Sequence, residues 1–272
     1  MKKLFCLLAA LALLAKPLRA EAAPQRYLAL TFDDGPSGEL TERLLEGLAE
    51  RQVRVTFFVC GYRIAEFPDT LSHIAAAGHE IGLHSSNHDY MQKMDYGTAL
   101  RDLTGCAKAV EDACGVRARL FRPPGGLYGD TLLKAAGDAG LSVILWSVDP
   151  CDWNEAAWDG VLPTVLSEAH DGRIILMHEL YDATSQACDT VIPWLNQQGY
   201  QMVTVSELIQ FRQAAVAGGN GKQYSAFRPQ PTEAAPVTEA VSATNTAPVA
   251  DSEVAPAPVA ESSVAESPVA ET

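Results

Sequence analysis

The segment YLALTFDDGPSGELTERLLEGLAERQVRVTFFV, residues 27–59, decides the fold class. Two apolar runs, Tyr27–Phe32 and Val53–Val59, flank a more polar stretch, Leu40–Arg51, in which leucines recur at the spacing of one helical face. The two runs are short and rich in aromatic and β-branched residues, as strands are. A strand, a helix and a strand in this order predict that the two strands are parallel.

The same alternation continues towards residue 205. Further strands are predicted at Glu80–Leu83, Arg119–Phe121, Leu141–Val148, Arg173–Met177 and Gln201–Val205. Further helices are predicted at Asp69–Ala77, Tyr96–Ala113, Thr131–Ala139, Trp158–His170 and Ala183–Gln198. This pattern predicts an α/β fold with a parallel sheet, and by itself it permits either a closed barrel or an open doubly wound sheet.

Charged residues and histidines occur just past the predicted strands and favour the barrel. They are Asp33 and Asp34, His84, Arg122, Asp149 and Asp152, and His178. In a parallel barrel the C-terminal ends of all strands open on one face, where such folds carry their chemistry. We therefore expect a distorted parallel (β/α) barrel of about seven strands, built as a single domain, with five segments converging on one site.

Three of these segments hold residue types that suit a hydrolytic metal site. Asp33 and Asp34 follow a strand, so that in the turn one carboxylate could bind a metal while the other stays free as a base. His84 and His88 are four residues apart, and a helical turn would bring both rings to one ion. Aspartate pairs also cap turns, and surface histidines with this spacing are common. It is the combination that predicts a divalent metal site.

His178 ends the sixth strand candidate and is a candidate acid. Its imidazole titrates in the range that protonation of a leaving amine requires. A histidine at a strand end can also be an ordinary hydrogen-bonded residue. The other histidines lie in predicted helices or before a strand, and we assign them no role.

The two ends of the chain differ from the domain in composition. Residues 1–23 begin with Lys2 and Lys3, followed by an apolar stretch and then small residues, the layout of a signal peptide. The apolar stretch is shorter than the roughly 20 residues of a membrane span. We expect no stable membrane span. The domain is placed at residues 24–215, and the Pro/Ala/Glu/Val-rich segment 216–272 is predicted to be a disordered tail. Its role, whether a spacer or a solvated end, stays open.

The net charge limits the possible binding partners, and the number of cysteines limits the possible disulfides. The formal net charge of −14 argues against nucleic acid and anionic lipid as partners. Without Cys6, in the signal peptide, an odd number of cysteines remains: Cys60, Cys106, Cys114, Cys151 and Cys188. At most two disulfides and one free thiol follow. Cys106 and Cys114 could clip the end of one helix, and Cys60 has the surroundings of a buried thiol.

Five motifs in order resemble those of the polysaccharide deacetylases, the NodB-homology group or carbohydrate esterase family 4. They are Thr31-Phe32-Asp33-Asp34-Gly35-Pro36, His84-Ser85-Ser86-Asn87-His88, Arg122-Pro123-Pro124-Gly125-Gly126, Asp149-Pro150-Cys151-Asp152-Trp153 and Leu176-Met177-His178. The resemblance spans about residues 27–210 and implies the same distorted barrel. It implies a divalent ion, Zn²⁺ in the first place and Co²⁺ or another divalent ion as alternatives, held by Asp34, His84 and His88.

The resemblance also implies roles for the remaining site residues. Asp33 would be the base held by Arg122, and His178 the acid tuned by Asp152. Leu176 and Trp153 would line the acetyl pocket, and the backbone N–H of Gly125 would bind the oxyanion. The family has an aromatic residue where this chain has Gly125, so a ring is missing from the cleft, and Tyr128 is the candidate that replaces it.

The expected reaction is hydrolysis of the acetyl group on N-acetylated amino sugars, outside the cytoplasm or in the cell envelope, by a monomer. The resemblance in the stretch from His178 to Leu208 favours peptidoglycan over chitin oligosaccharides as the glycan. An O-deacetylase acting on acetylated xylan and an inactive sugar-binding module remain alternatives, because the residues alone do not separate amide from ester and a fold does not guarantee activity.

Overall fold

The computed structural model describes residues 25–213 and 223–227, all within one compact unit, Met1–Thr232. The strands are β1 (Arg26–Asp33), β2 (Thr56–Val59), β3 (Glu80–Leu83), β4 (Leu120–Phe121), β5 (Ser142–Ile144), β6 (Ile174–His178), β7 (Tyr200–Met202) and β8 (Gln223–Tyr224). The helices are α2 (Glu39–Glu50), α3 (Gly61–Glu66), α4 (Pro68–Ala76), α5 (Tyr96–Cys114), α6 (Asp130–Asp138), α7 (Trp158–Glu168), α8 (Asp182–Gln197) and α9 (Val205–Gln213), with 3₁₀ turns η1 (Pro124–Gly126) and η2 (Glu155–Ala157).

The strands form a curled parallel sheet in the order β6-β1-β2-β3-β4-β5-β8, with β7 alongside the first residues of β1. Every pairing between these strands is parallel. Beyond β5 the chain turns back, and Val148 forms a parallel bridge with Ile175 of β6. The two sides of the sheet are thereby brought together, and the distorted (β/α) barrel expected from the sequence is confirmed.

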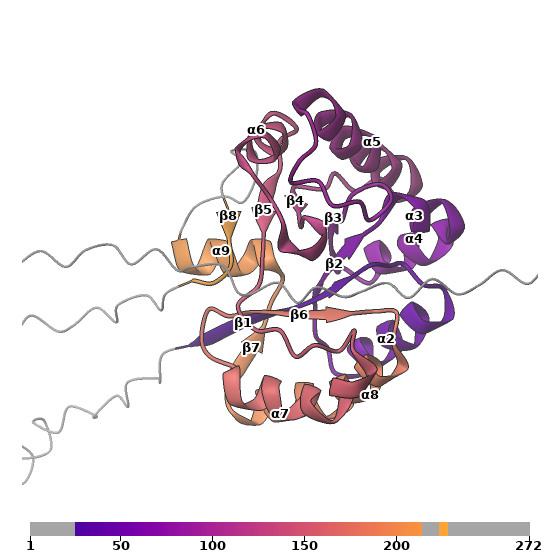
Figure 1. Ribbon diagram of the computed structural model, residues 1–272. Coiled ribbons are helices and arrows are strands. Elements are labelled where there is room, and N and C mark those ends of the chain that lie inside the picture. The colour runs from indigo at the N-terminus through magenta and orange to yellow at the C-terminus, as the bar shows by residue number, and fades with distance from the viewer. Residues whose placement is uncertain (1–24, 214–222, 228–272) are drawn as a thin grey trace, which may run out of the picture. The chain divides into compact units, whose positions relative to one another are not determined.

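Helices surround the strands on the outside (Figure 1). In α2 the buried residues are Thr41, Leu44, Leu45 and Leu48, the face expected from the leucine spacing, apart from Leu40. Burying a leucine contributes roughly 1.5–3 kcal/mol, so this face is sufficient to hold the helix on the sheet. Figure 1 shows α2 beside α8, and α5 beside α6 at the opposite side of the sheet.

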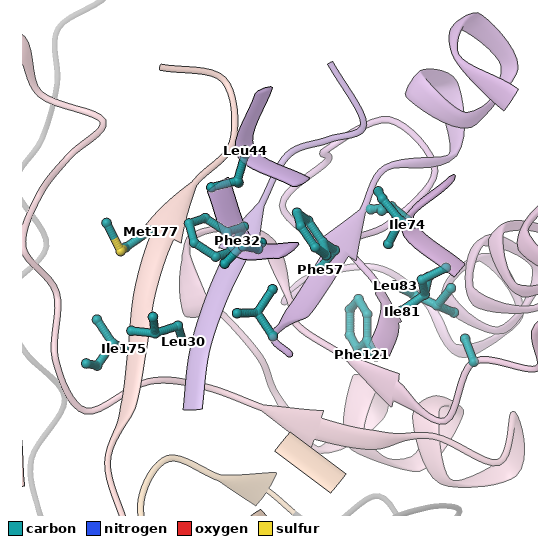
Figure 2. Close-up of a cluster of buried hydrophobic side chains, with 14 of the residues drawn as sticks. Leu30, Phe32, Leu44, Phe57, Ile74, Ile81, Leu83, Phe121, Ile175 and Met177 are labelled. Atoms are coloured by element: carbon teal, nitrogen blue, oxygen red, sulfur yellow. The ribbon is translucent and has the colours of Figure 1, made fainter. Parts of the chain in front are cut away.

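The period of two along each strand divides the sheet into an outer and an inner face. Leu30 and Phe32 of β1 join the core cluster shown in Figure 2, together with side chains of β2, β3, β4 and β6. Ala29 of β1 belongs to a second, separate cluster on the other face. Thr31 and Asp33 share the parity of Ala29. The end of β1 therefore presents Asp33 to the interior of the barrel.

The domain continues past the boundary at residue 215 that composition suggested. β8 pairs with β5, and Phe227 is buried against the same inner cluster. Gly172 makes this possible, because a Cβ there would lie 1.9 Å from the backbone oxygen of Phe227. The remaining predicted tail and the predicted signal peptide lie outside the described residues.

The disulfide between Cys106 and Cys114 that the sequence allowed does not form in the described part of the chain. All five cysteines of the described ranges are free thiols. Cys106 and Cys114 lie on the same helix, α5, where eight residues span about 12 Å of axis, too far for a disulfide. Cys60 is fully buried, as expected.

Several shorter elements differ from the expectation. α3, α9 and β8 were not predicted, because segments this short carry little periodicity. α7 ends at Glu168, so His170 lies outside the helix. Among the described residues, none of the helices has the length and apolar character needed to cross a membrane.

Candidate active site

The turn after β1 separates the two neighbouring aspartates. Asp33 is the last residue of the strand and is 2% exposed, whereas Asp34 adopts a left-handed backbone conformation with φ 75°. Such a conformation costs about 1–3 kcal/mol for a residue other than glycine, and it persists only where the surroundings enforce it. Because of this change of conformation, the two carboxylates face different partners.

The segment after β3 brings the two histidines together without a helical turn, and the helical geometry considered from the sequence was wrong. Ser85 and His88 both have positive φ, 64° and 60°, and the segment is an irregular loop. The ring centroids of His84 and His88 lie 5.1 Å apart. The loop is fixed by Asp102 of α5, whose carboxylate accepts from the backbone N–H of Ser86 at 3.0 Å.

The carboxylate of Asp34 lies between the two histidines. Its Oδ1 is 3.3 Å from Nε2 of His84 and 3.3 Å from Nε2 of His88, and the three candidate ligand atoms lie within 4.8 Å of one another. Burial raises the pKa of Asp34, but the neighbouring histidines in their protonated form, His84 above all, lower it to about 2. Asp34 is therefore an anion at neutral pH.

The donor atoms of this triad fit a divalent cation. Nδ1 of His84 lies 2.7 Å from the backbone oxygen of Arg122, so the ring proton sits on Nδ1 and Nε2 presents a lone pair. Oδ1 of Asp34, opposite this lone pair, is buried without a hydrogen-bond partner. Lone pairs of two imidazoles and a carboxylate converging on one point suit a metal ion, and Zn²⁺ takes these ligand types.

Asp33 is paired with a fully buried arginine. Nη1 of Arg122 donates to Oδ1 of Asp33 at 2.7 Å and to Oγ1 of Thr31 at 2.8 Å. The rest of the guanidinium donates to the backbone oxygens of Ile144 and Leu145. Every side of the guanidinium therefore has an acceptor, as a buried charge requires.

His178 is held by Asp152, a second buried carboxylate. Nδ1 of His178 lies 2.7 Å from Oδ1 of Asp152, and its backbone N–H donates to Oδ2 at 2.7 Å. Thr184 of α8 donates to the same Oδ2 at 2.6 Å. Burial lowers the pKa of His178, but the hydrogen bond and charge of Asp152 outweigh it, with help from Asp33, and raise it to about 9. The imidazole is protonated at neutral pH.

The expected pocket residues have different degrees of exposure. Leu176 is buried two residues before His178, and Trp153 is 48% exposed beside Asp152. Gly125 lies in η1 with φ 64°. Tyr128 is 38% exposed between η1 and α6, but the ring that approaches Gly125 is that of Tyr90.

Sequence reasoning missed three residues that support the site. Asp102 and Thr184 lie in helices, where nothing in the local sequence marks them. Glu179 follows His178 and is fully buried: its backbone N–H donates to the oxygen of Asp33, and its carboxylate accepts from Thr41. Burial raises the pKa of Glu179 to about 8. These partners are far apart in sequence and come together only in the fold.

Comparison of the chain with known proteins identifies its family. The family profile described as polysaccharide deacetylase matches residues 20–144. A peptidoglycan-N-acetylglucosamine deacetylase of Bacillus cereus is 35% identical over 193 residues, which cover 69% of this chain and 90% of that protein. The chain belongs to the polysaccharide deacetylase family. The family resemblance noted in the sequence is thereby confirmed.

Other relatives of this chain differ in length and in named substrate. The peptidoglycan-N-acetylmuramic acid deacetylase PdaC of Bacillus subtilis is 38% identical over 68% of this chain, and the match covers only 39% of PdaC. The chain thus spans about two fifths of the length of that relative. A chitooligosaccharide deacetylase of Sinorhizobium fredii is 32% identical, over 68% of this chain and 91% of that protein.

Solved structures of related proteins agree in fold with this chain. The structure of PdaC superposes with a TM-score of 0.64 at 37% identity, covering 68% of this chain and 91% of that one. A family 4 acetyl xylan esterase from Clostridium thermocellum, in complex with a cobalt ion, gives 0.69 at 28% identity, covering 74% and 98%.

Proposed function

We propose that this chain is an exported, metal-dependent hydrolase that removes acetyl groups from N-acetylated amino sugars of a polysaccharide, with peptidoglycan as the substrate. The observation that carries the proposal is the buried Oδ1 of Asp34, which has no hydrogen-bond partner and faces Nε2 of both His84 and His88. Relatives named for peptidoglycan deacetylation support the choice of glycan and a site of action in the cell envelope or outside the cell.

The metal ligands are Asp34, His84 and His88, and the ion is Zn²⁺, with Co²⁺ able to substitute. The cobalt ion in the related esterase supports a divalent metal at such a site. When bound, the ion supplies Lewis-acid activation of water and of the acetyl carbonyl. The backbone oxygen of Arg122 holds His84 in the tautomer that this coordination requires.

Asp33 accepts the proton of the attacking water. Its Oδ1 is taken by Arg122, while its Oδ2 faces the metal side, 3.7 Å from Nε2 of His84. Arg122 thus fixes which oxygen is presented to the water.

His178 donates a proton to the departing amine. Nδ1 of its ring faces Asp152, so Nε2 is the atom that carries the proton towards substrate. The raised pKa, about 9, keeps His178 charged at neutral pH. The N–H of Gly125 stabilises the oxyanion, and Leu176 and Trp153 line the acetyl pocket. Loss of one hydrogen-bond donor to an oxyanion typically raises the activation free energy by about 3 kcal/mol.

Acetate release from a panel of acetylated glycans tests the proposal. The protein, with zinc added, is incubated with peptidoglycan, chitin oligosaccharides and acetylated xylan. We expect release from peptidoglycan to be fastest. Faster release from chitin oligosaccharides would change the glycan, and release from xylan alone would make the chain an O-deacetylase. No acetate from any of them, with metal bound, would leave a sugar-binding role and contradict the proposal.

A further inference from the structure

Gly125 and Tyr90 occupy adjoining space at the rim of the site. Gly125 has φ 64°, a conformation that side chains disfavour, and a Cβ built on it would lie 2.9 Å from Cε1 of Tyr90. The neighbouring turn residue, Gly126, has the same relation to another ring, since its Cβ would lie 2.8 Å from Trp146. The volume that a side chain at position 125 would enter is therefore already taken by the ring of Tyr90.

Tyr90 lies between a proposed metal ligand and a buried residue, while its own ring stays open to solvent. It lies two residues after His88, with the two ring centroids 6.4 Å apart, and it is followed by Met91, which is fully buried. Further along, a Cβ built on Gly129 would lie 3.3 Å from the backbone oxygen of Gln92, so the two segments approach closely. The chain after the ring is thus held in place, yet 63% of Tyr90 remains exposed.

We infer that Tyr90 is a substrate-positioning residue: its ring packs against a sugar of the glycan and takes the place of the aromatic residue missing at position 125. This inference rests on the proposed function. A tyrosine ring offers a flat apolar face with a hydrogen-bonding hydroxyl at its edge, which matches a pyranose with its axial C–H groups and hydroxyls. Tyr90 lies between the metal ligand His88 and the oxyanion donor Gly125. A sugar packed on its ring would therefore place the acetamide near both residues.

Kinetic constants of Tyr90 variants test the inference on the glycan that the unmodified chain deacetylates fastest. Contact with a sugar away from the reacting bond stabilises ground state and transition state alike, so Tyr90→Ala should raise KM roughly tenfold with kcat within about twofold. Tyr90→Phe keeps the ring and should stay within about threefold in KM. Tyr90→Leu fills space without a flat ring and should behave like Tyr90→Ala.

Tyr96→Ala is the matched control, because Tyr96 is an exposed tyrosine on α5 whose hydroxyl donates to Asp138. It should leave KM unchanged. Metal content of every variant should equal that of the unmodified chain. An unchanged KM in Tyr90→Ala, a wild-type KM in Tyr90→Leu, loss of metal from Tyr90→Ala, or the tenfold rise in Tyr128→Ala alone would each overturn the inference. If the unmodified chain released no acetate from any glycan, the proposed function would fail instead.

Discussion

On one side of the site, Asp33 and Asp152 are buried carboxylates whose partners come from the chain itself: Arg122 donates to the first, and His178 and Thr184 to the second. On the other side, Asp34 is a half-buried carboxylate whose buried Oδ1 faces two ring nitrogens and has no donor. A buried charge without a partner is costly. The proton-transfer side is thus complete within the chain, whereas the proposed function assigns an added cation to the metal side.

Arg122 belongs to both sides and links them. Its guanidinium binds Asp33, and its backbone oxygen accepts from Nδ1 of His84. A change of the Arg122 side chain should therefore disturb the proton-transfer side and leave the metal side intact. The two sides can be separated experimentally for this reason.

Removal of the metal should have the largest effect. Chelation should abolish acetate release, since no residue of the chain can replace Lewis-acid activation of the carbonyl, and added zinc or cobalt should restore it. The metal should also raise the melting temperature, because an ion that binds only the folded state stabilises it. Full activity in the stripped protein, checked by metal analysis, would contradict the proposed site.

Asp152→Asn should come next, with a loss of roughly 100- to 10,000-fold in kcat, the usual value of general acid catalysis. The substitution removes the main cause that raises the pKa of His178, so the remaining burial lowers it. The alkaline limb of the kcat profile should then move to lower pH. A pH–rate profile with an unmoved alkaline limb would show that His178 is not the acid.

The same pair makes folding stability depend on pH. His178 has a folded pKa of about 9, above its ordinary value of 6.5. Its contribution is therefore fully present below pH 6.5 and is lost as the pH rises through about 9. Denaturant unfolding should show this loss in the unmodified chain and not in Asp152→Asn. Equal pH dependence of both proteins would contradict the assignment.

Arg122→Met should affect the proton-transfer side of the site and not the metal side. It leaves Asp33 as an unpaired buried carboxylate, which typically costs about 3–5 kcal/mol of stability. The backbone oxygen that holds His84 remains, so zinc affinity measured by chelator competition should change little. A large loss of zinc affinity in a folded variant would show that the two sides are not separable.

Thr184→Val should have the smallest effect. It removes one hydrogen bond to the charged Oδ2 of Asp152, and such bonds contribute about 1.5–3 kcal/mol. Activity should fall modestly, and the pKa of His178 should shift less than in Asp152→Asn. A loss of rate as large as that of Asp152→Asn would mean that Thr184 does more than hold the carboxylate.

The parallel α/β fold and the position of Asp33, Arg122 and His178 at strand ends could be predicted from the sequence because both follow from simple periodicity, whereas the roles of these residues were implied by the family resemblance. In parallel strands with a period of two, Asp33, Arg122 and His178 at the strand ends must meet on the inner face. What failed depends on contacts between distant segments. β8 pairs with β5, and Phe227 after it packs against Gly172, a contact between segments far apart in the sequence. The loop between His84 and His88 owes its shape to left-handed residues and to Asp102, which local patterns do not show.

The roles of the two adjacent aspartates are tested most directly by metal content measured beside turnover in Asp33→Asn and Asp34→Asn. The account predicts that Asp33→Asn keeps its metal and loses roughly 100- to 10,000-fold in turnover, because an amide cannot take the proton. Asp34→Asn should lose the metal, because a neutral amide is a much poorer ligand than a carboxylate. If Asp33→Asn lost the metal and Asp34→Asn retained it, the two roles would be exchanged and the account contradicted.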